Sequence, residues 1–229
     1  MIYKNKILAV IPARGGSKGI KLKNLKKINK KSLVEITAKF VSKCDFIDFA
    51  VLSTDHPKIA REGKKFGLSI IDRPKKLSGD KISDVNVLIH ATSEIEKKFK
   101  KFDVIVMLHP TSPLRNINDL RKSIKLLISK KYDSVWTVSK TDTKFHPDKQ
   151  LILKKNKIKF FTKKGSKIIY RQQLSNVYHR NSNAYVVKRD FLIKSQNLIS
   201  RNTGAFIIKS KQVSIDTFED LEKAKKYFN

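Results

Sequence analysis

The 229-residue sequence has one cysteine, Cys44, and therefore cannot form an internal disulfide. Its apolar runs, such as residues 104–108, are far shorter than the about 20 residues that a membrane-spanning helix needs. Residues 1–6 lack the apolar core and the small-residue cleavage site of a secretory signal. We therefore expect a soluble protein of the reducing cytoplasm, with no membrane partner and with Cys44 as a buried structural thiol.

Acidic residues are scarce: 20 Asp and Glu stand against 51 Lys and Arg, which leaves a formal net charge of +31. Such a balance raises the question of nucleic-acid binding. However, only nine of the basic residues are arginine, the side chain favoured for bidentate contacts, and the lysines are spread over the whole chain. We expect no specific nucleic-acid recognition, but a salt-sensitive attraction to anions, small anionic substrates included.

Glycine is also sparse, yet three of the eight glycines fall in one stretch, residues 7–24, where an apolar strand runs into a basic loop. That loop combines these glycines with four cations, namely Gly15, Gly16 and Gly19 with Arg14, Lys18, Lys21 and Lys23. Glycine allows backbone N–H groups to approach an anion, and Arg14 can donate two parallel hydrogen bonds to phosphate. The spacing matches neither G-x-x-x-x-G-K-[ST] nor G-x-G-x-x-G. It predicts a phosphate-binding loop of another nucleotide-handling class, while a solvated surface turn is the alternative.

Segments typical of strands and helices alternate through the first two thirds of the chain, which predicts an α/β fold with a largely parallel sheet. The predicted strands are residues 7–11, 49–53, 68–71, 102–108 and 134–138. The predicted helices are residues 32–43, 57–66, 83–99 and a helix from Asn116 or Asn118 to 129. In the helix at 83–99, Val87, Ile95 and Phe99 are expected to face inward.

The alternation breaks at residues 140–181, where Lys, Asn, Gln and Ser dominate. Short apolar pieces at 158–161 and 168–170 are typical of hairpin strands, so this segment is predicted to be an inserted arm in one domain spanning 1–229. Beyond it, strands are predicted at 184–187, 205–208 and 213–215, followed by a helix at 218–228.

Ligands of open α/β sheets bind beyond the carboxyl ends of the strands. Four segments are expected there: the basic glycine loop, Ser53-Thr54-Asp55, the run from His109 to Arg115, and Asp216-Thr217. They bring phosphate donors, hydroxyl groups and a carboxylate to one crevice.

Five motifs in this order resemble a known family. They are IPARGGSKGIKLKN at 11–24, STD at 53–55, RP at 73–74, HPTSPLR at 109–115 and SIDTFEDLEKA at 214–224. The chain resembles the cytidylyltransferases that activate acylneuraminic and related nonulosonic acids, with 3-deoxy-manno-octulosonate synthetases as more distant relatives. The resemblance implies a three-layer, Rossmann-like nucleotide-diphospho-sugar transferase fold and a homodimer formed through the arm at 140–181. In such a dimer the arm is expected to contribute residues to the sugar pocket of the neighbouring subunit.

The same resemblance implies the reaction. The anomeric hydroxyl of an acidic nine-carbon sugar, such as sialic acid, attacks the α-phosphate of CTP, pyrophosphate leaves, and a CMP-sugar forms. Arg14 and Lys23 match the residues that bind the triphosphate and support catalysis, with Gly15, Gly16, Ser17 and Lys18 completing the phosphate-binding loop. Asn24 and Arg73 match residues near the base and ribose, whereas the base-contacting segment at 77–84 aligns only loosely.

Two residues are expected to bind the sugar. His109, at the position before PTSPLR, is expected to hydrogen-bond it, and Arg180 in YHRNSNA matches an arginine near the acidic sugar. His109 could instead pack under the loop, and Arg180 could be a solvated base. Arg115 is expected to anchor the loop, the alternative being a contact with the sugar carboxylate.

For the metal, the family typically carries D-x-D before the last helix, whereas this chain has Ser214, Ile215 and Asp216. Asp216 alone is expected to bind Mg²⁺ with phosphate oxygens and water. Thr217 and Asp220 also form a T-x-x-D pattern that predicts a helix cap, and both roles are compatible.

Two other functions stay open at this stage. One is a nucleotidyltransferase that uses another nucleotide or sugar, such as 3-deoxy-octulosonate or a sugar phosphate. The other is a catalytically weakened, nucleic-acid-associated homologue, which the positive charge and the missing carboxylate favour.

Overall fold

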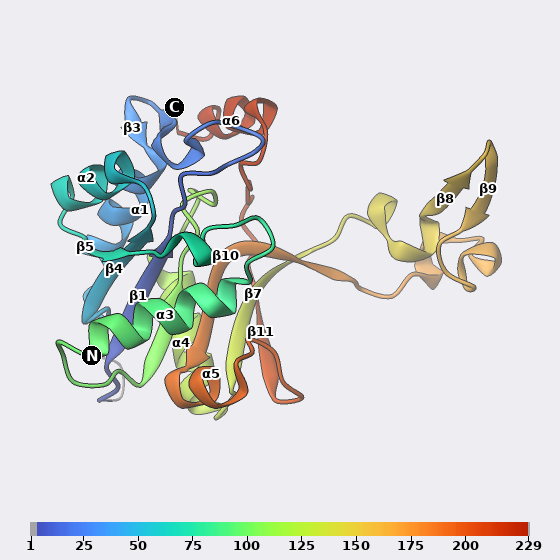
Figure 1. Ribbon diagram of the computed structural model, residues 1–229. Coiled ribbons are helices and arrows are strands. Elements are labelled where there is room, and N and C mark those ends of the chain that lie inside the picture. The colour runs from blue at the N-terminus through green and yellow to red at the C-terminus, as the bar shows by residue number, and fades with distance from the viewer. Residues whose placement is uncertain (1–3, 229) are drawn as a thin grey trace.

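Seven strands form the central sheet of the computed structural model, which describes residues 4–228 (Figure 1). The strand order is β11-β7-β10-β6-β1-β4-β5. The strands are β1 (Ile7–Pro12), β4 (Phe49–Thr54), β5 (Ser69–Asp72), β6 (Val104–Met107), β7 (Ser134–Lys140), β10 (Tyr178–Lys188) and β11 (Thr203–Ile207). Only β10 runs antiparallel to its neighbours, β6 and β7. This confirms the predicted, largely parallel sheet.

Six α-helices connect or follow these strands: α1 (Leu33–Ser42), α2 (Pro57–Lys65), α3 (Asp84–Glu96), α4 (Ile117–Ser129), α5 (Arg189–Ser195) and α6 (Phe218–Lys225). Five of them, all except α5, begin where the sequence predicts. At four of these starts, the side chains of Ser32, Ser83, Asn116 and Thr217 accept hydrogen bonds from first-turn amides. None of the helices within residues 4–228 is long and apolar enough to cross a membrane.

Short elements complete the body and the arm. The hairpin strands are β2 (Lys27–Ile28) with β3 (Lys31–Ser32), and β8 (Leu151–Lys154) with β9 (Lys157–Phe160). The 3₁₀ turns are Lys23–Leu25, Lys75–Leu77, Thr143–Phe145, Pro147–Lys149, Gly165–Lys167 and Arg171–Gln173.

Apolar side chains fill both faces of the sheet. Strand β1 contributes Ile7, Ala9 and Ile11 to one face and Leu8 and Val10 to the other, and all five are fully buried. The first face is covered by α1, α2 and α4, and the second by α3 and α5. Because adjacent residues of a strand point to opposite faces, a continuous apolar run is what a strand between two helical layers requires. The fold is the predicted three-layer α/β fold.

Three sequence predictions are wrong. Phe99 does not face inward: it lies beyond the end of α3, is 49% exposed, and packs on Phe49. The segment at 168–170 is not a strand, because β9 pairs with β8 instead. The segment at 213–215 is not a strand either: its apolar residue Ile215 fills a third cluster beneath α6 and donates a backbone hydrogen bond to Thr111. Helix α5 was not predicted.

The segment between β7 and β10 reaches far from the sheet as an arm (Figure 1). Its β8–β9 hairpin pairs Leu151 with Phe160 and Leu153 with Ile158. Directly paired residues share a face, so these four apolar side chains form one face of the hairpin, and they are 46–68% exposed. No residue of the arm belongs to the three buried clusters described for residues 4–228.

Candidate functional site

A cleft of about 560 Å³ lies where β1, β5 and β6 end. Its walls come from the glycine loop, the segment from Arg73 to α3, the loop that starts at His109, and Asp216. Eight of the predicted site residues line it: Arg14, Ser17, Lys18, Lys23, Asn24, Arg73, His109 and Asp216. Gly15, Gly16 and Arg180 are not among the lining residues.

The glycine loop needs two of its glycines for close approach. A Cβ atom on Gly19 would lie 2.4 Å from the carbonyl oxygen of Asp216, and one on Gly15 would lie 2.7 Å from the His56 ring. Gly16 has open space around its Cα atom. The Gly15 amide donates to Asp55 Oδ1 at 2.8 Å, so in this conformation it is bound within the protein. The loop is therefore held against both the STD segment and the segment before α6.

Three of the four cations of the loop, Arg14, Lys18 and Lys23, have a carboxylate partner. Arg14 Nη1 lies 2.8 Å from Asp80 Oδ1, and Lys18 Nζ lies 2.8 Å from Asp80 Oδ2. Hydrogen bonds from Lys18 and Arg14 lower the pKa of Asp80 below its ordinary value. Lys23 Nζ lies 2.7 Å from Asp216 Oδ1 and is largely buried. Three cations thus converge on the cleft with two carboxylates as their counterions.

Asn24 and Arg73 are buried polar residues that line the cleft. Asn24 is buried and donates through Nδ2 to the carbonyl oxygen of Arg14, which orients the start of the loop. Arg73 is also buried and donates to the hydroxyl and the carbonyl oxygen of Ser53. Burial lowers the pKa of Arg73 to about 10, so the side chain stays cationic at neutral pH.

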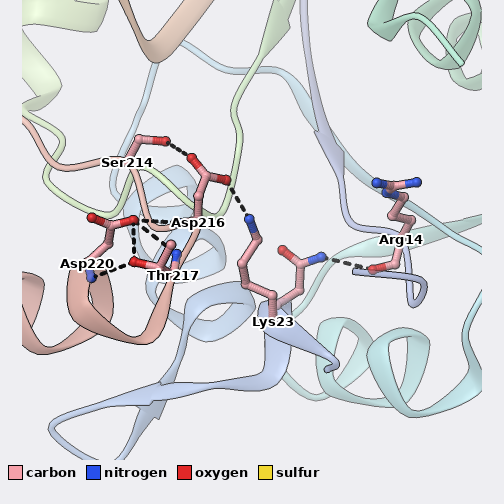
Figure 2. A network of polar contacts seen from close by, with 7 residues as sticks. Arg14, Lys23, Ser214, Asp216, Thr217 and Asp220 are labelled. Carbon is pink, nitrogen blue, oxygen red and sulfur yellow. Dashed lines mark hydrogen bonds and ion pairs between the residues drawn. The ribbon is translucent and has the colours of Figure 1, made fainter. Parts of the chain in front are cut away.

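Asp216 makes contacts through both carboxylate oxygens, as Figure 2 shows: Oδ1 accepts from Lys23, and Oδ2 accepts from Ser214 Oγ at 3.2 Å. Asp220 takes the capping role, because it accepts from the Thr217 backbone amide while Thr217 Oγ1 accepts from the Asp220 amide. The predicted capping box is confirmed.

Across residues 4–228, no three His, Cys, Asp or Glu side chains gather into a group that could hold a metal.

His109 also lines the cleft, with Nε2 3.4 Å from Asp84 Oδ2. Burial raises the pKa of Asp84, but hydrogen bonding from His109 and the charges of His109, Arg73 and Arg180 outweigh it, and the pKa falls below its ordinary value. Edge-to-face ring contacts continue from His109 to Tyr185 and on to Trp136. Arg180 is exposed, and its guanidinium lies 5.8 Å from the centre of the Trp136 ring.

Arg115 anchors its loop, as expected. It is not a lining residue of the cleft, and it donates to the carbonyl oxygens of His109 and Asn183. Burial lowers its pKa to about 9. Cys44 is buried too, which confirms the predicted structural thiol, and burial raises its pKa to about 11.

The sequence reasoning missed two carboxylates, Asp80 and Asp84, both of which line the cleft. Because the expected substrates are anions, the residues predicted to bind them are mainly cations, and the one predicted carboxylate is the metal ligand Asp216. Their position could have indicated this role, because both lie in the segment between Arg73-Pro74 and the start of α3 at Asp84.

Comparison with known proteins agrees with this geometry. The cytidylyltransferase family matches residues 8–228. The chain is 29% identical over 220 residues to post-translational flagellin modification protein B of Campylobacter coli, covering 95% of this chain and 92% of the relative. It is 29% identical to CMP-N,N'-diacetyllegionaminic acid synthase of Campylobacter jejuni, covering 94% and 92% of the two chains.

Among solved structures, CMP:2-keto-3-deoxy-manno-octonic acid synthetase complexed with CTP superposes with a TM-score of 0.74 at 16% identity, covering 97% of this chain and 98% of that one. At that identity the likeness concerns the fold. The family match extends over nearly the entire sequence, from the first buried strand to the last helix. The chain therefore belongs to the cytidylyltransferase family.

Proposed function

We propose that the protein couples CTP to a nonulosonic acid of the sialic acid type, releasing pyrophosphate and forming a CMP-sugar. The observation that carries the proposal is the cleft in which Arg14, Lys18 and Lys23 converge at the end of β1. Relatives include synthases named for legionaminic, pseudaminic and N-acylneuraminic acids. A reducing cytoplasm, where CTP is available and Cys44 stays a thiol, is the proposed compartment.

Arg14, Lys18 and Lys23 are proposed to bind the triphosphate. Arg14 donates paired hydrogen bonds to phosphate oxygens, while Lys18 and Lys23 supply charge. Such charges placed in advance stabilise the negative charge that moves onto the leaving pyrophosphate. Ser17 and the amides of Gly15 and Gly16 add donors, and binding through Gly15 requires its hydrogen bond to Asp55 to break. Asn24 and Arg73 are proposed to border the base and ribose.

The sugar is proposed to bind at the His109 end of the cleft. Asp84 orients the His109 ring through Nε2, so that His109 can hydrogen-bond the sugar. Arg180 is exposed, and its guanidinium stacks on Trp136, which pre-orients it to pair with the sugar carboxylate. Holding the two substrates at adjacent ends of one cleft brings the attacking hydroxyl to the α-phosphate.

Magnesium fits this site only in part. Asp216 is exposed and would hold Mg²⁺ together with phosphate oxygens and water, an arrangement common for this ion. Lys23 and Ser214 already contact the two carboxylate oxygens, so the ion shares Asp216 with them or displaces them. When bound, Mg²⁺ would neutralise charge on the triphosphate.

Pyrophosphate release tests the function, measured over a matrix of CTP, UTP, ATP and GTP against a sugar phosphate and against sialic, legionaminic, pseudaminic and 3-deoxy-octulosonic acids. We expect turnover with CTP and at least one nine-carbon acid. Turnover only with 3-deoxy-octulosonate or a sugar phosphate would support the other transferase function. No turnover together with tight, salt-dependent RNA binding would support a noncatalytic homologue.

Replacing Arg14 or Lys23 by alanine should lower kcat/KM by about 100- to 1000-fold, because each supplies charge to the triphosphate in the transition state. Steady-state kinetics of pyrophosphate release measures the loss. Lys64→Ala is the control, since Lys64 is an exposed lysine of α2 outside the cleft. A loss of only a fewfold for both cleft variants would contradict the assigned roles.

Asp216→Ala should raise the Mg²⁺ concentration needed for half-maximal turnover by about tenfold or more, because the proposed protein ligand is lost. Titrating Mg²⁺ in the kinetic assay, and counting bound Mn²⁺ in the presence of CTP, measures the change. Glu219→Gln, an exposed acid three residues away, is the matched control. Unchanged metal dependence in Asp216→Ala would rule out the ligand role.

We also propose that the arm forms a homodimer. Its hairpin exposes Leu151, Leu153, Ile158 and Phe160 on one face, an apolar surface that an isolated chain leaves in water. Lys154, Lys157 and Lys159 lie on the opposite face, so the apolar face is the one suited to a second copy.

Ile158→Asp should weaken the dimer by about 30-fold or more, since a carboxylate would replace an apolar contact at its centre. Light scattering across a dilution series measures the mass. Lys159→Gln changes the net charge equally but lies on the other face, and should leave the mass unchanged. Equal dimerisation of all three proteins would disprove this interface.

A further inference from the structure

Asp80 binds two of the three cations that the glycine loop contributes to the cleft. Its carboxylate oxygens divide between them, with Oδ1 at 2.8 Å from Arg14 Nη1 and Oδ2 at 2.8 Å from Lys18 Nζ. Arg14 Nη1 also approaches the carbonyl oxygen of Ser78 at 3.4 Å. The segment at 78–80 therefore supplies two acceptors to the same guanidinium, and a phosphate bound by Arg14 would compete with them.

The two ends of this contact are fixed to different extents. The Arg14 backbone is held by Asn24, whose Nδ2 donates to the Arg14 carbonyl oxygen at 3.1 Å. Asp80 instead lies in a loop between the 3₁₀ turn Lys75–Leu77 and α3, and its side chain is 39% exposed. A Cβ atom on its neighbour Gly79 would meet only Ile82, at 3.7 Å, so the loop is not tightly packed there. Asp80 therefore lies on the less constrained side of the contact.

We propose that Asp80 is a positioning residue that holds Arg14 and Lys18 in the nucleotide-free cleft and competes with pyrophosphate for them. A phosphate chain carries more negative charge and more acceptor oxygens than one carboxylate, so it displaces Asp80 on binding. When the reaction is complete, Asp80 pairs again with the two cations and favours departure of pyrophosphate. An aspartate carboxylate is ionised at neutral pH, as this competition requires, and hydrogen bonds from Lys18 and Arg14 lower the pKa of Asp80 further.

The chemistry of the cleft explains the need for such a residue. The chain carries a net charge of +31, and clustered cations bind a multiply charged product tightly. A movable carboxylate weakens the binding of pyrophosphate without removing the cations that act in the transition state. The inference rests on the proposed function only in taking pyrophosphate to be the leaving product.

Binding of inorganic pyrophosphate to the full chain, measured by titration calorimetry without CTP or sugar, tests the competition directly. Asp80→Asn should bind pyrophosphate about three- to tenfold more tightly than the unmodified protein, the range expected when partly exposed ion pairs no longer compete. Asp45→Asn is the matched control. It removes a carboxylate that pairs with an arginine, Arg121, outside the cleft and changes the net charge equally, so its affinity should not change.

Two further measurements separate competition from a merely structural role. In a Lys18→Met background, Asp80→Asn should produce a smaller gain in affinity, because one of the two cations is already gone. In turnover assays, the inhibition constant for pyrophosphate should fall in Asp80→Asn by the same factor as its Kd. Equal or weaker pyrophosphate binding by Asp80→Asn would overturn the proposal. If no NTP is turned over, the proposed function fails while the binding result still decides the role of Asp80.

Discussion

The parallel pairing of β1 with both β4 and β6 is the constraint on which the site depends. Parallel neighbours end on the same side of a sheet, so the loops that follow these strands must meet. The glycine loop follows β1, the Asp55 segment follows β4, and the His109 loop follows β6. Strand β1 can hold this central position because its residues are apolar on both faces and fully buried.

The close packing of the glycine loop extends this constraint to the far end of the chain. Gly19 lies against the backbone of Asp216, and Lys23 pairs with the carboxylate of the same residue. Ile20 and Ile215 share the third apolar cluster with α6, which keeps the two segments together. Gly15 and Gly19 therefore serve close packing, since neither has a positive φ angle.

Charge in the cleft is balanced locally, although the chain as a whole is strongly basic. Asp80, Asp84 and Asp216 face Arg14, Lys18, Lys23 and His109 across short distances. Cations placed close together would repel one another in the empty cleft, so carboxylates beside them stabilise the ligand-free protein. In the proposed function, Asp80 gives up Arg14 and Lys18 when a triphosphate binds, which makes this carboxylate part of the binding equilibrium.

The sequence by itself determined the layered α/β fold, the start of most helices, the arm and the cations of the glycine loop. These features depend on local patterns: apolar runs, side chains that cap helices, and glycine beside basic residues. Tertiary structure alone decided which carboxylate faces which cation, because Arg14 and Asp80 are joined by folding and not by sequence spacing. It likewise decided that the apolar alternation at 213–215 serves a buried cluster and not a strand, and that β9 pairs with β8 and not with 168–170. An alternating pattern records which residues are buried but does not identify the partner that buries them.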